Sequence, residues 1–457
     1  MKWCLTCNTP VIGDYCGKCN SPAHDLRISI LSDPRPAFIG GLSLIREALT
    51  NEFSEKAFEI LFEKGTDCIL FGRLPYLDFA VQVISDSCIV GHLFFDLYTM
   101  SWRFKPLYPA IVKLLENGLI DKISISSKVE RGEIIGKSSD EKFKAIIYEN
   151  QIFGLAEVRG DKLIVARIFR EREKEIPTVN SKQSLKSLIE ANDETIRTLE
   201  SRSCKHLFRI ARRIGKPVVI SYSGGKDSLA CLHLAFKAGI EPILLFGNTG
   251  MEMPETIRNF EKVSDKYSLR AEVSEAKEIF WKEAKTKGPP ARDFRWCCKN
   301  CKLKPMLEMI QSNIGNALLV VGQRRLESHR RLRYPSVWKD PIFKGYVSTS
   351  PINDWPALAI WTYLMSRNLL DDVNELYFKG FSRIGCYMCP SGKIGDYRMV
   401  ESLHPDLWRE WDDFLIEWMK KHGYSEYWRK YALWRWKNLP KKMKMFLTEI
   451  RRLESVH

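Results

Sequence analysis

The sequence lacks the long apolar runs of a membrane protein. Its 457 residues contain no uninterrupted apolar stretch of the roughly 18 residues that a spanning helix needs. The first residues, Met1 to Cys4, contain no apolar signal core, so we expect a cytoplasmic protein without a membrane partner. Internal repeats and low-complexity tracts are also absent, which excludes fibrous architectures and a wholly disordered chain.

Acidic residues are the second scarce class. The chain has 71 Lys and Arg against 56 Asp and Glu, which gives a formal net charge of +15. A basic excess of this size favours a polyanionic partner, and nucleic acid is the first candidate. The alternative is a basic surface that serves only solubility.

Cysteine, in contrast, is plentiful. The chain has 13 cysteines, and without an export signal their tight clusters indicate metal sites rather than disulfides. The spacing Cys4-x2-Cys7-x8-Cys16-x2-Cys19 places two CxxC pairs in one short segment. Four thiolates close a tetrahedral zinc site, and so short a segment cannot build a core without one. Residues 1–25 are therefore predicted to form a zinc ribbon with a structural Zn²⁺.

The rest of the chain divides by the periodicity of its apolar residues. Short runs such as Ala145–Tyr148 and Leu163–Phe169, separated by turns, predict strands, whereas later runs alternate between strand and helix. That alternation predicts an α/β domain with a parallel sheet. The predicted segments are a small α+β domain, a small β-barrel, a helical linker, the α/β domain and a helical, basic and aromatic C-terminal segment, at residues 26–90, 91–176, 177–203, 204–400 and 401–457.

A glycine loop follows the predicted strand Pro217–Ser221 and precedes a predicted helix. It reads Ser221-Tyr222-Ser223-Gly224-Gly225-Lys226-Asp227-Ser228. The glycines let the backbone approach a ligand, and consecutive amides at a helix N-terminus form an anion site to which Lys226 adds charge. The spacing differs from GxxxxGK[ST], which excludes the kinases and GTPases that use that loop.

The SGGKDS motif resembles the pyrophosphate loop of the adenine-nucleotide α-hydrolase fold. Further segments resemble the phosphoadenosine phosphosulfate (PAPS) reductase family, whose motifs are DTGxxFPET, GxRxxES, PIxDW and RIGCxxCP. The matching segments here are Asn248–Thr256, Gly322–Arg331, Pro351–Trp355 and Phe381–Pro390. The resemblance covers about 205–395 and departs at Asn248, where the family has Asp, so the loop carries one charge fewer.

This resemblance implies that the domain binds ATP or an adenylyl-sulfate nucleotide, with Mg²⁺. The residues that it assigns to nucleotide binding are Ser221, Ser223, Gly224, Gly225, Lys226, Asp227, Ser228, Asn248, Thr249, Gly250, Glu255, Gly322, Arg324 and Arg331.

A second cysteine group, Cys297-Cys298-x2-Cys301 with Cys386-x2-Cys389, resembles the cluster ligands of the iron–sulfur reductases in this family. The resemblance implies a [4Fe–4S] cluster on Cys297, Cys298, Cys386 and Cys389. Cys301 is then a substitute ligand, or a spare thiolate that serves as nucleophile or persulfide carrier. A second zinc site is the alternative, because Cys298, Cys301, Cys386 and Cys389 also form two CxxC pairs.

Two further features point to RNA. The segments Val129–Ile135, Phe153–Ala156 and Val165–Arg167 resemble a PUA-type RNA-binding barrel. No cysteine follows Cys389, whereas the sulfonucleotide reductases carry a catalytic cysteine in a C-terminal tail. The combination of zinc ribbon, PUA-like barrel and this catalytic domain resembles archaeal proteins.

These features lead to two enzyme hypotheses. The first is an ATP-using, iron–sulfur RNA-modifying enzyme that transfers sulfur through an adenylated intermediate, with tRNA as the expected substrate. Its expected catalytic residues are Lys226, Asp227 and Cys301, and its expected protein partner is a sulfur donor or a reductant. The second is a phosphoadenylyl or adenylyl sulfate reductase that uses an external thiol. A non-catalytic RNA-binding scaffold leaves the intact phosphate loop unexplained, and fold resemblance alone cannot choose, since one fold hosts many reactions.

Overall fold

The computed structural model describes residues 1–140 and 142–454. The chain folds into two compact units. The first contains residues 1–76 and 80–195, and the second contains Leu77–Phe79 and the chain from Ile196 onward. The boundary expected between residues 203 and 204 falls inside one long helix, α4 (Leu185–Ile214), so the sequence 177–203 is only in part a linker. Within the described part of the chain, no helix has both the length and the apolar character needed to cross a membrane.

The N-terminal cysteines lie in a small antiparallel sheet with the order β2-β1-β3. Its strands are β1 (Lys2–Cys4), β2 (Thr9–Val11) and β3 (His24–Asp25). This ribbon packs on α4, because its cysteines share a buried cluster with Ala191, and the Gly17 amide donates to the Ala191 carbonyl at 2.8 Å. The side chain of Asn192 holds the ribbon backbone as well, accepting from the Ile12 amide at 2.7 Å.

An antiparallel sheet with the order β4-β5-β6-β7-β8 follows the ribbon. Its elements are η1 (Ile30–Ser32), β4 (Arg35–Pro36), α1 (Phe38–Glu52), α2 (Ala57–Leu61), β5 (Leu70–Arg73), β6 (Ala80–Ser85), β7 (Cys88–Asp96), β8 (Ser101–Pro106) and α3 (Tyr108–Glu116). The boundary expected between residues 90 and 91 falls inside β7, which pairs with β6 and β8. The first sheet therefore continues to Pro106, because alternating apolar residues predict a strand but not the sheet that it joins.

A second five-stranded sheet has the order β10-β13-β12-β11-β9. Its elements are β9 (Asp121–Ser124), β10 (Ile134–Lys137), β11 (Phe143–Tyr148), β12 (Gln151–Arg159), β13 (Lys162–Ile168) and the short η2 (Glu171–Glu173). The predicted strands Ala145–Tyr148 and Leu163–Phe169 are confirmed apart from Phe169, which follows β13. The expected β-barrel is not confirmed, because no pairing joins the end strands β9 and β10 among the described residues.

The second unit is built on a six-stranded sheet with the order β16-β15-β14-β17-β19-β18. Every pairing is parallel except that of β18 with β19, which confirms the predicted α/β fold. The strands are β14 (Val218–Ser221), β15 (Ile243–Asn248), β16 (Ala271–Glu275), β17 (Leu318–Val321), β18 (Val337–Lys339) and β19 (Val347–Thr349). Val219, Leu245 and Leu319 pack on Met306 and Ile310, so α8 covers one face of the sheet.

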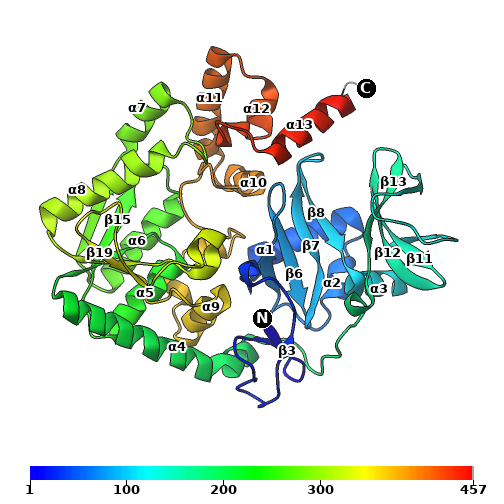
Figure 1. Ribbon diagram of the computed structural model, residues 1–457, viewed down its shortest axis with the longest axis horizontal. Helices are drawn as coiled ribbons and strands as arrows, with labels where there is room; N and C mark the ends of the chain where they lie inside the picture. The colour runs from blue at the N-terminus through cyan, green and yellow to red at the C-terminus, as the bar shows by residue number, and fades with distance from the viewer. Residues whose placement is uncertain (141, 455–457) are drawn as a thin grey trace. The chain divides into compact units, whose positions relative to one another are not determined.

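Helices surround this sheet and continue into the C-terminal segment (Figure 1). Those of the sheet domain are α5 (Lys226–Lys237), α6 (Pro254–Lys266), α7 (Lys277–Lys287), the π-helical η3 (Cys298–Leu303), α8 (Lys304–Asn313), η4 (Arg325–Glu327), η5 (His329–Arg331), α9 (Ala357–Ser366), η6 (Leu370–Asp372) and η7 (Glu375–Tyr377). Those of the C-terminal segment are α10 (Ile394–Leu403), α11 (Pro405–His422), α12 (Glu426–Lys430), η8 (Leu433–Arg435) and α13 (Lys441–Glu454), as the helical pattern predicts.

Candidate functional site: a phosphate loop beside a cysteine group

The glycine loop leaves β14 at the point where the strand order reverses. From β14 the chain continues to β15 and β16 on one side, then returns to β17 and β19 on the other. At such a point the loops after neighbouring strands diverge and leave a crevice for a ligand. The loops after β14, β15 and β17 therefore meet at one edge of the sheet, and they carry most of the predicted nucleotide-binding residues.

Two glycines shape the phosphate loop. Gly224 has a φ of +70°, and a Cβ there would lie 3.0 Å from Cγ2 of Thr256. At Gly322 a Cβ would lie 2.7 Å from the Ser228 amide nitrogen, so the loop after β17 directly contacts the start of α5. The Ser228 hydroxyl accepts a hydrogen bond from the Ser223 amide at 3.3 Å. The loop is thus closed on the helix N-terminus, where backbone amides favour an anion.

Asp227 lies between two buried cations at the start of α5. Lys226 Nζ is 2.5 Å from Oδ2, and Arg324 Nε donates to Oδ1 at 2.8 Å. Burial opposes the charge of Asp227, but Lys226 and Arg324 outweigh it and lower the pKa of the carboxyl group. The carboxylate therefore stays ionised and fixes both cations beside the loop.

A row of arginines continues from this pair toward the cysteines. Burial lowers the pKa of Arg331, and repulsion from Arg324 and Arg383 acts in the same direction. Arg383 Nη2 in turn lies 3.8 Å from the Cys389 sulfur. We call Arg324, Arg331 and Arg383, which lie between the phosphate loop and the second CxxC motif, the basic strip; within it, Arg331 is also paired with Glu327.

The loop after β15 is held by its own side chains. Asn248 Oδ1 accepts from the Gly250 amide at 2.9 Å, and its Nδ2 donates to Glu275. The Thr249 amide and hydroxyl both donate to the carboxylate of Glu252, which is buried. Asn248 and Thr249 thus shape the loop, and Glu252 completes it, although its position carries no motif signal in the sequence.

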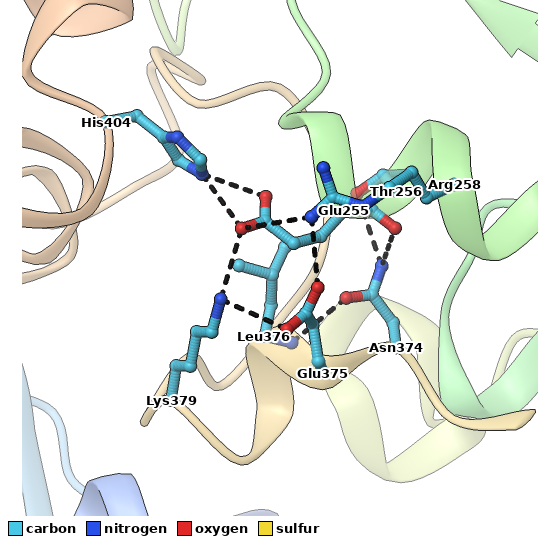
Figure 2. A network of polar contacts seen from close by, with 8 residues as sticks. All are labelled: Glu255, Thr256, Arg258, Asn374, Glu375, Leu376, Lys379 and His404. Carbon is cyan, nitrogen blue, oxygen red and sulfur yellow. Dashed lines mark hydrogen bonds and ion pairs between the residues drawn. The ribbon is translucent and has the colours of Figure 1, made fainter. Parts of the chain in front are cut away.

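The carboxylate of the predicted nucleotide-binding residue Glu255 forms ion pairs with cationic side chains of the protein (Figure 2). His404 Nε2 lies 2.9 Å from Oε2, and Lys379 Nζ lies 3.2 Å from Oε1 of the same carboxylate. Burial opposes the charge of Glu255, but its own backbone amide, His404 and Lys379 outweigh it and lower its pKa. Glu255 therefore joins α6 to the segments that carry Lys379 and His404, and reaches the loop only through its neighbour Thr256.

Two residues at the loop lie outside every sequence motif. The Tyr377 hydroxyl accepts from the Lys226 amide at 3.3 Å, and a Cβ at Gly225 would lie 3.4 Å from that same oxygen. Asn374 Nδ2 donates to the Thr256 hydroxyl at 3.4 Å, directly behind Gly224. Both come from the segment around η7, roughly 150 positions along the chain, so no local pattern could indicate them.

The second cysteine group is spread more widely than a single-ion site. Among the described residues, only the N-terminal set has three or more metal-type ligands within 4.8 Å of one another. Cys297 donates to Cys298, and that bond, helped by Arg295, lowers the pKa of Cys298 to about 5 despite burial. The hydrogen bond to Cys298 and burial, followed by the charges of Cys298, Cys386 and Cys389, raise the pKa of Cys297, so the Cys386–Cys389 pair lies near the Cys297–Cys298 pair.

Cys301 differs from the other four. It is fully buried in the π-helical turn η3, and burial, then the charge of Glu283, raises its pKa to about 11. The predicted role of Cys301 as a nucleophile or persulfide carrier has no support in this geometry, because nucleophilic thiols need access and a lowered pKa.

Two arginines hold the loop that follows Cys389. Arg292 donates to the carbonyls of Pro390 and Gly392, both at 2.7 Å. Arg435, fully buried and paired with Asp78, donates to the Gly392 carbonyl at 2.9 Å. Arg292 of the sheet domain and Arg435 of the C-terminal segment therefore position the loop of the second CxxC motif.

The four N-terminal cysteines form a compact set. The sulfurs of Cys4 and Cys19 lie 3.5 Å apart, and those of Cys7 and Cys16 lie 3.9 Å apart. A tetrahedral site with metal–sulfur bonds of about 2.3 Å places its sulfurs about 3.8 Å apart. The Cys7 amide donates to the Cys4 sulfur at 3.3 Å, which further stabilises a thiolate. This set can hold one metal ion.

Comparison with known proteins agrees with this geometry. The family model "Phosphoadenosine phosphosulfate reductase domain" matches residues 217–392. Uncharacterized protein MJ0066 of Methanocaldococcus jannaschii is 32% identical, over 96% of each chain. The adenosine 5'-phosphosulfate reductase of Geobacillus kaustophilus is 27% identical over 39% of this chain and 74% of its own. Among solved structures, PAPS reductase from Candida auris aligns at a TM-score of 0.34 and 20% identity, covering 43% of this chain and 95% of that one.

Residues 217–392 therefore form a PAPS reductase domain, the class of protein that the phosphate loop and strand order define. The chain as a whole belongs to one family with MJ0066 of Methanocaldococcus jannaschii, which it matches from end to end.

Proposed function

We propose that this protein is an ATP-using enzyme that transfers sulfur to RNA, with tRNA as the substrate class. The basic strip of Arg324, Arg331 and Arg383 carries the proposal. It joins a phosphate loop to a cysteine group inside one folded unit. Nucleotide activation at the loop and sulfur delivery at the cysteines can thus act on one bound substrate.

The reaction balances without an oxidant or a reductant. The carbonyl oxygen of a base attacks the α-phosphorus of ATP, and pyrophosphate leaves. A sulfur nucleophile at the oxidation level of sulfide then adds to the base carbon, and AMP leaves with the former carbonyl oxygen. The products are a thiocarbonyl base, AMP and pyrophosphate, with the proton released to water.

The chain's own residues have defined tasks in this scheme. Backbone amides of the loop and Lys226 hold the departing pyrophosphate, since helix N-termini and cations favour anions. Arg324 and Arg331 neutralise the charge that develops on the α-phosphate. Asp227 keeps Lys226 and Arg324 in place beside the loop, one cation on each carboxylate oxygen.

The cysteine group fits an iron–sulfur cluster better than a zinc ion. The Cys386–Cys389 pair lies near the Cys297–Cys298 pair, yet among the described residues no three of these sulfurs lie within 4.8 Å of one another. Arg295 donates to the Cys298 sulfur at 3.3 Å, so cations flank the thiolates that a cluster would require. When bound by Cys297, Cys298, Cys386 and Cys389, a [4Fe–4S] cluster would supply thiolate-ligated iron beside the anion strip.

Two observations favour RNA over a free sulfonucleotide. The net charge of +15 suits a polyanion, and the relatives that act on adenosine 5'-phosphosulfate match only 39% of this chain or thereabouts. Residues 390–454 form packed helices without any cysteine, so they do not supply the attacking thiol of a reductase tail. Sulfonucleotide reduction with an external thiol is the second candidate, favoured by the adenosine 5'-phosphosulfate reductases among the relatives.

The decisive experiment is mass spectrometry of tRNA and rRNA nucleosides from a strain that lacks the gene, compared with its parent. We expect the loss of one thiolated nucleoside and its return on complementation. An unchanged nucleoside profile together with an inability to grow on sulfate would overturn the proposal in favour of sulfonucleotide reduction.

Replacing Cys386 with serine is expected to remove the iron and the acid-labile sulfide of the anaerobically purified protein, because a cluster needs four thiolates. The matched variant, Cys301→Ser, should keep both, since Cys301 is fully buried and is not one of the four expected ligands. Metal analysis by mass spectrometry makes the measurement. Loss of iron in Cys301→Ser but not in Cys298→Ser would show that Cys301, and not Cys298, is the fourth cluster ligand. Zinc in place of iron in the wild-type protein would contradict the cluster.

A further inference from the structure

The C-terminal segment carries two kinds of aromatic residue. Trp411 and Trp434 are buried, with exposures of 0% and 3%, and they pack in the core of the second unit. Trp418, His422, Tyr424 and Trp428 instead form a series of ring contacts near the surface, with a wider step of 6.3 Å between His422 and Tyr424. Trp418 and Trp428 are partly exposed, and Tyr424 is 47% exposed. A folded domain gains little stability from such exposed rings, so this second set calls for another explanation.

The local sequence builds this stack directly. Trp418 and His422 are four residues apart on α11, and their rings lie parallel with centroids 4.0 Å apart. Gly423 ends the helix with a φ of +68°, which turns the chain so that Tyr424 lies next to His422. Trp428 comes four residues later, on α12, and its ring lies 4.7 Å from that of Tyr424 at an interplanar angle of 4°.

The two ends of the stack differ. At one end Trp418 is covered by the chain at Gly288, where a Cβ would lie 2.6 Å from the indole. At the other end, Trp428 has a ring contact only with Tyr424 among the described residues. Trp428 is partly exposed, so the part of its indole that solvent reaches is where a further flat ring can stack.

Cations lie along the ring series: Lys421 Nζ is 6.0 Å from the Trp418 ring and Lys430 follows Trp428 on α12, whereas Arg429 is paired with Asp412. Residues 417–430 contain four Lys or Arg and two Glu, and Lys420, Lys421 and Lys430 are exposed. The basic helix α13 follows α12 in the same segment (Figure 1). Its Phe446 packs on Tyr431, just after α12, and its Arg451 guanidinium lies 5.9 Å from the Tyr427 ring. An exposed aromatic platform inside a positive surface is the arrangement that holds single-stranded nucleic acid, because bases stack on the rings while cations hold phosphates.

We propose that the ring stack of Trp418, His422, Tyr424 and Trp428 is a docking surface for an unpaired segment of RNA, with a nucleobase stacking on Trp428. This inference rests on the proposed function for its RNA substrate and adds where the chain holds that RNA. A base-paired helix cannot stack a base on Trp428 in this way, since its bases are already stacked on one another.

The test measures binding of a short fluorescein-labelled oligoadenylate by fluorescence anisotropy, without ATP. Removing one stacked ring costs about a 5- to 150-fold loss of affinity, so Trp428→Ala should weaken binding within that range. Trp428→Phe should retain most of the affinity. Met445→Ala removes an apolar side chain that is 62% exposed on α13 and should change nothing. Binding to the oligoadenylate–oligouridylate duplex should be equal in all four proteins.

A second readout needs no variant. Ultraviolet cross-linking of the wild-type protein to oligoadenylate should place the cross-link on the peptide that contains Tyr424 and Trp428. Cross-links only elsewhere, or equal affinity in Trp428→Ala and wild type, would overturn the proposal and leave this surface to a protein partner. Nucleoside analysis of the deletion strain does not depend on this binding test. An unchanged nucleoside profile together with weaker binding by Trp428→Ala would therefore reject sulfur transfer and still support RNA stacking at this surface.

Discussion

Replacing Arg324 with methionine is expected to lower ATP-dependent AMP formation by about 100- to 1,000-fold. Arg324 is 4% exposed and reaches the loop through Asp227, so methionine keeps most of its packing but removes a fixed positive charge beside the phosphates. Loss of one preorganised group that stabilises developing negative charge typically costs that factor in rate. The measurement is AMP release with tRNA as the acceptor.

The neighbouring residue gives a matched control. Arg325 pairs with Asp354, but both side chains are exposed, 37% and 64%, and the pair faces solvent rather than the loop. Exposed ion pairs are worth about 0–1 kcal/mol, so Arg325→Met should leave both the rate and the stability close to wild type. Equal rates for the two variants would show that the basic strip does not take part in the reaction.

Removing the N-terminal metal is expected to unfold the ribbon, as our second large effect. Structural zinc in short Cys-rich segments contributes about 10–16 kcal/mol of apparent free energy at neutral pH, and residues 1–25 have little other core. We expect Cys16→Ser to lose one zinc per chain and to expose the ribbon to limited proteolysis. Because Cys16 shares a buried cluster with Ala191 of α4, the unfolding temperature of the first unit should also be lower in this variant.

Cys88 supplies the control for this second prediction. It is buried, 8% exposed, and lies in β7 away from the four ribbon cysteines, so Cys88→Ser perturbs a packed thiol without removing a ligand. We expect full zinc content in Cys88→Ser. Retention of zinc in Cys16→Ser, or iron in place of zinc in the wild-type ribbon, would contradict the structural zinc site.

Several residues that sequence motifs indicate as functional have structural contacts in the folded protein. Glu255 belongs to a family segment, but its carboxylate pairs with Lys379 and His404, which come from distant parts of the chain. Cys301 belongs to a plausible CxxC pair, yet the π-helical turn buries it completely. A motif specifies residue types at a spacing, whereas burial and side-chain partners depend on segments that pack there from elsewhere.

Boundaries were the weakest part of the sequence reading. The first sheet extends past residue 90 because β7 pairs on both edges within it, and α4 runs through the expected end of the linker. Period-two and period-3.6 patterns identify strands and helices, but neither pattern says which neighbour an element joins. The predicted barrel is not confirmed for the same reason, since closure depends on pairing between its end strands.

The sequence by itself determined the parallel α/β domain, its phosphate loop and the two cysteine groups, because each depends on residue types at short, fixed spacings. Only the tertiary structure decided that Arg324 clamps Asp227, that Tyr377 contacts the loop, and that Trp418 to Trp428 stack at the surface while Trp411 and Trp434 are buried. These relations join residues whose separation along the chain carries no local pattern. They arise where the hydrophobic core brings the elements together.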